Sequence, residues 1–157
     1  MEIKLTKEQY ENLLKIVYLG NWMINAIRSG TEGDEQIEKY NDIEQYIFSF
    51  AKDVGLGKYI EFDKKYNKFF PTIDFEQDEE IERYLKDYNE ETFWQELADR
   101  LGTRDFIREY GEEAINKMDQ EERFIKLQEF IVKYEEEFEK NGIENLEVLK
   151  RIDDILK

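Results

Sequence analysis

The stretch Thr6–Ile27, TKEQYENLLKIVYLGNWMINAI, is the longest apolar segment of the chain and begins with residues that are typical of a helix N-terminus. Thr6 is followed three residues later by Gln9, and this spacing predicts a capping box in which each side chain binds the other residue's backbone N–H. Apolar side chains cover much of the circumference of the predicted helix, and such a helix is normally central in its domain. We therefore expect a buried N-terminal helix that runs to about Ser29 and stops at Gly30.

The remainder of the chain is also mostly helical by its pattern. One proline and eight glycines in 157 residues, with many Glu, Lys, Leu and Ile, favour helices over strands and turns. The apolar periodicity predicts helices over residues 34–54, 77–88, 89–101, 103–110, 119–140 and 144–156, and either a small β-hairpin or an irregular loop near residues 58–72. We expect an all-α or mostly α fold, an irregular bundle of six to eight helices around the buried N-terminal helix. The chain is short enough for this to be a single acidic domain over residues 1–157.

The composition excludes several chemistries. The chain has no cysteine and no histidine. Disulfides, thiolate nucleophiles, histidine general bases and the catalytic triads that need them are therefore absent. The first six residues lack the basic and apolar segments of a signal peptide. Glu11, Lys15 and Asn21 interrupt the apolar stretch, which disfavours a membrane span. We expect a cytoplasmic protein without a membrane partner.

The net charge is −16 and it is unevenly distributed. Residues 1–74 hold 13 acidic and 10 basic residues, a net charge of −3, whereas residues 75–157 hold 26 and 13, a net charge of −13. A field of this sign repels nucleic acid phosphates and attracts basic protein surfaces. We expect no direct nucleic acid binding, and an acidic face that binds a basic protein. The carboxylates expected to form this face are Glu76, Asp78, Glu79, Glu80, Glu82, Glu135 and Glu136.

This charge pattern predicts a non-catalytic interaction protein. Carboxylates held on helices can be spaced like backbone phosphates, and in charge and size the chain is similar to small acidic proteins that block DNA-binding enzymes by this imitation. Inhibition of a nucleic-acid-handling enzyme is therefore one form of the hypothesis. A merely solvated surface explains each acidic run individually but explains the asymmetry between the two halves less well. A helical oligomer with the N-terminal helix as its interface is a further alternative.

Two carboxylate pairs suggest an enzyme instead. Glu79 and Glu82 form E-x-x-E, and Glu96 and Asp99 form E-x-x-D. On two antiparallel helices these pairs would face each other and hold Mg²⁺ or Mn²⁺, which prefer oxygen ligands. This spacing resembles the metal motif of the all-α nucleotide pyrophosphatases, and the resemblance implies a metal-dependent enzyme. Glu96 and Asp99, however, lie opposite the apolar stripe of their predicted helix, so we prefer the non-catalytic hypothesis, with no cofactor.

Three polar residues of the N-terminal helix form a stripe. Asn21, Asn25 and Arg28 follow one another at helical spacing, and Lys15 and Glu11 extend the same line. The stripe is either a polar pocket or a solvent-exposed edge. We expect the exposed edge, because charged residues continue it.

Overall fold

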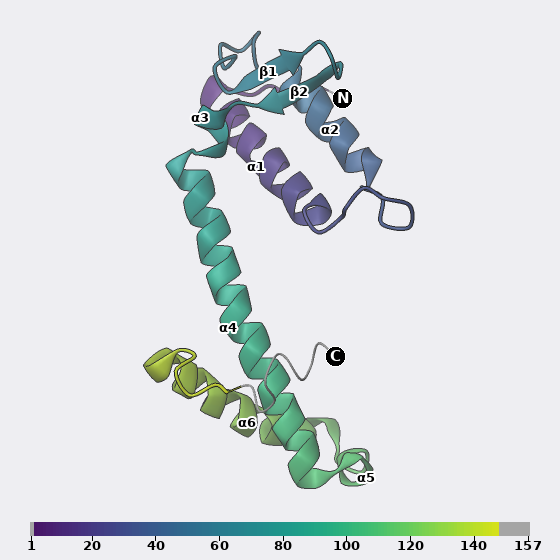
Figure 1. Cartoon of the computed structure of the whole chain (residues 1–157), viewed down its shortest axis with the longest axis vertical. Coiled ribbons are helices and arrows are strands. Elements are labelled where there is room, and N and C mark those ends of the chain that lie inside the picture. The colour runs from purple at the N-terminus through teal and green to yellow at the C-terminus, as the bar shows by residue number, and fades with distance from the viewer. Residues whose placement is uncertain (1, 148–157) are drawn as a thin grey trace. The chain divides into compact units, whose positions relative to one another are not determined.

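The computed structural model describes residues 2–147, and the chain divides into two compact units, unit 1 (Met1–Leu85) and unit 2 (Lys86–Lys157). The structure is 63% helical. In residues 2–147 it contains six helices and one two-stranded antiparallel sheet (Figure 1). This confirms the predicted mostly α class and the small hairpin. The expectation of a single domain concerns cooperative unfolding and stays a prediction.

Helix α1 (Lys7–Asn25) begins where the sequence predicted. The Thr6 hydroxyl accepts a hydrogen bond from the Gln9 N–H at 3.2 Å, and Gln9 Oε1 accepts one from the Thr6 N–H at 2.9 Å. The helix ends at Asn25, before the predicted Ser29, because the Asn25 carbonyl accepts from the Arg28 N–H in a turn. The helix is only partly buried, since Ile16 and Met23 are 66% and 52% exposed.

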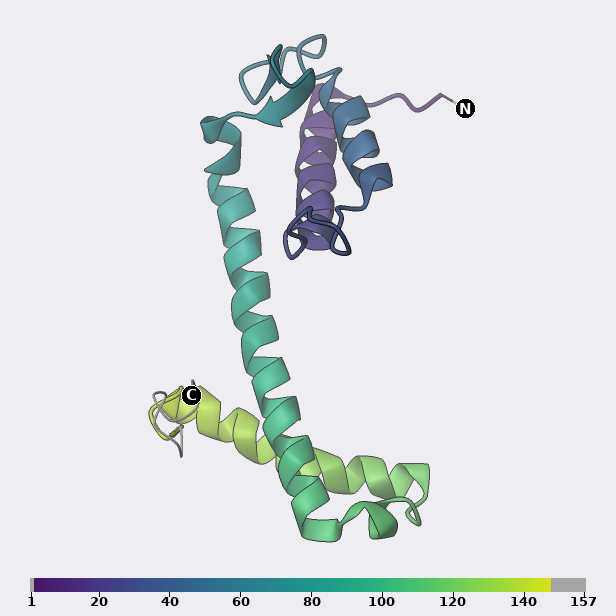
Figure 2. The same ribbon diagram turned by 45° about the vertical axis from the view of Figure 1, so that its right-hand side comes forward.

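Helix α2 (Glu38–Phe48) packs beside α1, as Figure 2 shows, and is shorter at both ends than the predicted helix over residues 34–54. Turns follow Phe48 and lead into the hairpin of β1 (Ile60–Asp63) and β2 (Lys68–Pro71). The Gln45 amide fixes the hairpin on α2: it accepts from the Phe69 N–H at 2.7 Å and donates to the Phe69 carbonyl at 2.8 Å.

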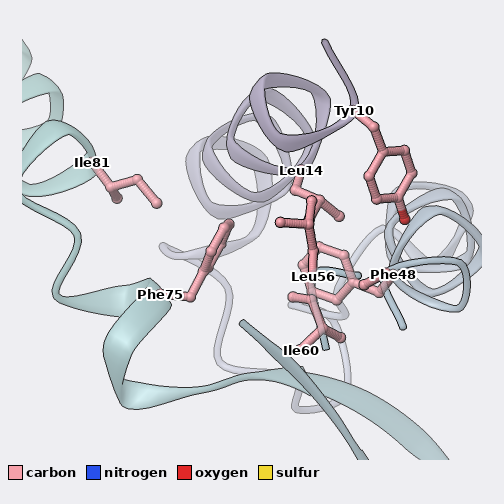
Figure 3. Packing of buried hydrophobic residues seen from close by; sticks show 8 residues of the cluster. Tyr10, Leu14, Phe48, Leu56, Ile60, Phe75 and Ile81 are labelled. Carbon is pink, nitrogen blue, oxygen red and sulfur yellow. The ribbon is translucent and has the colours of Figure 1, made fainter. Parts of the chain in front are cut away.

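The core of unit 1 is formed by side chains from α1, α2, the hairpin region, α3 (Ile73–Glu76) and the first turn of α4. Figure 3 shows Leu14, Phe48, Leu56 and Ile60 converging from these elements. Phe75 is completely buried and makes edge-on ring contacts with Tyr18 and Phe48. The buried apolar cluster comprises Tyr10, Leu14, Phe48, Ala51, Leu56, Ile60, Phe75 and Ile81.

Helix α4 (Glu79–Tyr110) replaces three predicted helices with one. The predicted boundaries at Asn89 and Gly102 lie inside this continuous helix. Gly102 does not end a helix but makes room for Ile131 of another helix. A Cβ atom built on Gly102 would lie 2.8 Å from Ile131 Cγ1 and 2.9 Å from the Ile131 backbone N and Cα. The glycine lets the backbones of two helices approach closely. In the sequence, a glycine needed for such close packing looks the same as a glycine that ends a helix.

Unit 2 is built from the second part of α4, α5 (Glu112–Ile115) and α6 (Gln120–Asn141). Asp119 caps α6 as predicted, accepting from the Glu122 N–H at 2.8 Å. Helix α6 crosses α4 (Figure 2). Its Ile131 and Phe138 are buried with Ala98 of α4 in one apolar cluster. A helix was predicted over residues 144–156. Residues 144–147 form turn and coil, and the remaining residues of this prediction lie outside the described part of the chain.

Candidate functional site: an acidic groove with an aromatic floor

The seven acidic residues predicted to form one face are divided between the two units. Glu76, Asp78, Glu79, Glu80 and Glu82 lie in unit 1, around the start of α4. Glu135 and Glu136 lie in unit 2, on α6.

Two carboxylates of the unit 1 group, Asp78 and Glu80, form ion pairs that stabilise the fold. Lys15 Nζ on α1 lies 3.0 Å from Asp78 Oδ1 and 2.7 Å from Glu80 Oε2, with only 12% of the lysine side chain exposed. Asp78 also accepts from the N–H groups of Glu80 and Ile81 and so caps α4. Burial raises the pKa of Asp78, but the hydrogen bonds from Lys15 and the backbone outweigh burial and hold the pKa below its ordinary value. Glu76, Glu79 and Glu82 remain exposed.

The two carboxylate pairs of the metal hypothesis lie on a single element. Glu79 and Glu82 are in the first turn of α4, and Glu96 and Asp99 follow on the same helix. The antiparallel helices needed to make the two pairs face each other are therefore not formed, and Glu96 instead pairs with Arg100 at 3.0 Å. Over residues 2–147 the structure has no group of three or more metal-ligating side chains placed to hold an ion.

Unit 2 contains a groove where α6 crosses α4, with a volume of about 500 Å³. Trp94 of α4 and Phe138 of α6 form its floor, with ring centroids 5.5 Å apart. Glu91 lies on the α4 side, and Glu135 and Glu139 lie on the α6 side. Residues three and four positions apart share one face of a helix, so each helix presents a carboxylate and an aromatic ring together. The full lining is Glu91, Trp94, Gln95, Glu135, Phe138 and Glu139.

Hydrogen bonds fix the α4 side of this groove. Gln95 Nε2 donates to Glu91 Oε1 at 2.6 Å, which orients that carboxylate. The Trp94 indole N–H donates to Glu90 Oε1 at 2.8 Å, which fixes the ring. The aromatic floor is therefore held in place before any ligand arrives, and ordering it on binding carries little entropic cost.

Some carboxylates of unit 2 are paired with a basic neighbour and others are not. Glu96, Asp105 and Glu122 each form an ion pair with a nearby Arg or Lys. Among the residues that the structure describes, no such pair involves Glu91, Glu135 or Glu139. The groove thus combines carboxylates without ion pairs and the partly exposed ring of Trp94, and both groups attract Arg and Lys side chains.

A second polar cluster ties the same two helices together. Asp105 of α4 accepts from Arg104 Nε at 2.8 Å and from the hydroxyl group of Tyr134 on α6. The hydrogen bonds from Arg104 and Tyr134 lower the pKa of Asp105 well below its ordinary range, although burial opposes them. This cluster satisfies its own charges and is structural.

Of the predicted binding residues, only Glu135 lines the groove. Glu91, Gln95 and Glu139 were missed, and so were the rings of Trp94 and Phe138. A signal for them exists in the sequence: Glu91-x-x-Trp94-Gln95 and Glu135-x-x-Phe138-Glu139 both place an acid three residues before an aromatic and a polar group directly after it. The signal was weak because the pairing of α4 with α6 was not known.

Comparison with protein-family models, with curated proteins and with solved structures finds no match to this chain. Over residues 2–147, no helix has both the length and the apolar character needed to cross a lipid bilayer.

Proposed function

We propose that this chain is a non-catalytic interaction protein whose unit 2 groove binds basic side chains of a partner protein. The observation that carries the proposal is the set of three carboxylates, Glu91, Glu135 and Glu139, without ion pairs among the described residues and placed around the rings of Trp94 and Phe138. The net charge of −13 over residues 75–157 supports it, because such a field steers a basic surface toward the unit.

The groove provides two kinds of attraction for one arginine or lysine. A cation placed over an aromatic face gains about 0.5–2 kcal/mol, depending on how far it is desolvated. A charge-assisted hydrogen bond to a carboxylate adds a comparable amount. Because α4 and α6 are held at a fixed crossing by Gly102 and Ile131, the carboxylates of the two helices keep a constant spacing.

A finer form of the proposal is inhibition of a nucleic-acid-handling enzyme in the cytoplasm. Carboxylates on two rigid helices resemble a row of phosphates in charge, and this would direct the chain to the surface that such an enzyme uses for its substrate. Duplex DNA should then compete with the chain for the same partner.

The test uses a fluorescein-labelled nona-arginine peptide and three forms of the full chain. The groove variant is Glu91→Gln, Glu135→Gln and Glu139→Gln; the matched control is Glu109→Gln, Glu112→Gln and Glu113→Gln, exposed carboxylates of the same unit outside the groove lining. Both variants lose three negative charges, so long-range attraction falls equally in each. We expect the groove variant to bind the peptide at least about tenfold more weakly than the control, a difference of about 1.4 kcal/mol.

Two further readouts accompany the affinity. Binding should change the fluorescence of Trp94 and should weaken steeply as salt is raised from about 0.05 M to about 0.3 M, because salt screens exposed charges. Equal weakening in the groove variant and in its control would show that only net charge matters and would contradict the groove as a site. For the finer form, a partner recovered on the unmodified chain that is not displaced by duplex DNA would exclude imitation of nucleic acid.

A further inference from the structure

Unit 1 contains a pocket that the proposed function does not use. It lies between α1, α2 and β2 and has a volume of about 310 Å³, which is at the lower end of the range for small-molecule sites. Its walls combine amide, aromatic and charged side chains. Its lining includes Tyr18, Asn21, Trp22, Asn25, Asn41 and Glu44.

One wall of the pocket is a fixed cluster of amides. Asn25 is 5% exposed, and its Nδ2 donates to Asn21 Oδ1 at 2.8 Å and to Asn41 Oδ1 at 3.2 Å. Its Oδ1 accepts from the Ile37 N–H at 2.8 Å, so the side chain is fully bonded and cannot turn away. The predicted solvent-exposed edge was therefore wrong at Asn25: Asn21 and Asn25 face α2, where the start of that helix requires partners for its backbone.

Glu44 is the one carboxylate in this wall. It is half-buried on α2, and no Lys or Arg within residues 2–147 forms an ion pair with it, although Lys68 of β2 also borders the pocket. Burial raises the pKa of Glu44, and a hydrogen bond from Asn21 opposes this effect. An ionised carboxylate held in a partly dry pocket is stabilised by a cation that enters beside it.

Aromatic side chains form other parts of the pocket wall. Trp22 and Tyr18 contribute aromatic surface from α1, and Phe69 and Phe70 contribute it from β2. Flat or apolar groups pack on such rings, and cationic groups are attracted to their faces. The amides carry few unused hydrogen-bond groups, because Gln45 is committed to Phe69 and Asn25 to its neighbours. The charged acceptor that the pocket offers to a ligand is thus the Glu44 carboxylate.

We propose that this pocket binds a small organic cation, a protonated amine, amidine or guanidinium on a flat apolar body, with its charge on Glu44 and its body against Trp22 and Tyr18. The site belongs to unit 1 alone and is independent of the groove in unit 2.

Benzamidine and benzamide test this proposal by isothermal titration calorimetry on the full chain, because the two probes have nearly the same shape and differ in charge. We expect benzamidine to bind at least about tenfold more tightly than benzamide. Glu44→Gln should abolish this preference. Asp42→Asn removes the same charge from an exposed position of the same helix outside the pocket lining, and it should leave the preference unchanged.

A pH series on the unmodified chain provides a second readout. Lowering the pH toward the raised pKa of Glu44 protonates a growing fraction of this carboxyl group, and benzamidine binding should weaken accordingly. In Glu44→Gln this pH dependence should disappear. Equal affinity for the two probes, an unchanged preference in Glu44→Gln, or no binding of benzamidine at concentrations on the order of 1 mM would each overturn the proposal.

Discussion

The two units of this chain differ in where their polar side chains form hydrogen bonds and ion pairs. In unit 1 they point inward: Asn25 is buried among amides, Lys15 is held between two carboxylates, and Gln45 binds the backbone of the hairpin. In unit 2 the charged residues form pairs along exposed helix surfaces, such as Glu96 with Arg100 and Glu122 with Lys126. The cores differ too, since the unit 1 cluster has eight buried apolar residues and the unit 2 cluster has three.

This difference indicates what each unit depends on. Hydrogen bonds that are shielded from water are costly to break, because the remaining partner is left unsatisfied. Exposed ion pairs contribute little. Unit 2 must therefore rely on the closeness of its two helices, and Gly102 is the residue that allows this closeness.

The largest expected effect comes from Gly102→Ala. The added Cβ would collide with the backbone of Ile131, and overpacking of this kind costs about 1–3 kcal/mol, here at the upper end because backbone atoms must move. Unit 2 should lose stability while unit 1 keeps it. Differential scanning calorimetry measures the two together, and single-tryptophan backgrounds separate them: Trp94 fluorescence with Trp22→Phe reports on unit 2, and Trp22 fluorescence with Trp94→Phe reports on unit 1.

Gly20→Ala is the matched control for this substitution. Gly20 lies inside α1 with nothing within 4 Å of its Cβ position, so alanine should stabilise that helix by up to about 1 kcal/mol. The same chemical change thus has opposite signs in the two units. If both transitions shift together in both variants, the units unfold as one body, and the prediction of a single domain gains its support.

A smaller effect is expected from Asn25→Ala in unit 1. The substitution removes the acceptor of the Ile37 N–H and leaves Asn21 and Asn41 without their shared donor. The cost of such unsatisfied groups is about 2 kcal/mol. Urea unfolding followed by Trp22 fluorescence measures it, with Asn12→Ala, an exposed position of the same helix, as the control. Equal midpoints for the two variants would show that the amide cluster contributes nothing to stability.

The smallest effect concerns Asp105 and the pH. Its pKa in the folded chain is lowered by Arg104 and Tyr134, so its stabilising contribution is fully present above the ordinary value of about 3.9 and is lost as the pH falls toward the lowered pKa. Asp105→Asn should reduce the stability of unit 2 by about 1 kcal/mol at neutral pH. It should also flatten the loss of stability in acid, measured by circular dichroism.

Glu44 in unit 1 should show the opposite sign. Its folded pKa is raised, so its contribution to stability is present below the ordinary value of about 4.3 and is lost as the pH rises through the raised pKa. The stability of Glu44→Gln and of Asp105→Asn is measured as a function of pH and compared with that of the unmodified chain. If both substitutions change the pH dependence of stability in the same direction, this contrast is contradicted.

Local signals in the sequence predicted the parts of the fold that are locally determined. Thr6 with Gln9, Asp119 and Gly142 mark helix ends because caps are made within a few residues. Gly102 misled because a glycine that admits another helix and a glycine that ends a helix look alike in one chain. Asn25 misled for a related reason: its partners Ile37 and Asn41 lie on another element, and a stripe of polar residues does not reveal whether water or a helix covers it. The groove on unit 2 combines residues of α4 and α6, so only Glu135 was identified beforehand.

The bond between Gln45 and Phe69 has a consequence for how molecules of this protein meet one another. A two-stranded hairpin normally offers a free edge on which a strand of a second molecule can pair, and this is a common route to aggregation. On β2 the Phe69 N–H and carbonyl are both occupied by the Gln45 amide, and Pro71, which points the same way along the alternating strand, has no N–H to offer. A single glutamine side chain therefore takes the place that a foreign strand would need on β2 and closes this edge of the hairpin to β-sheet growth.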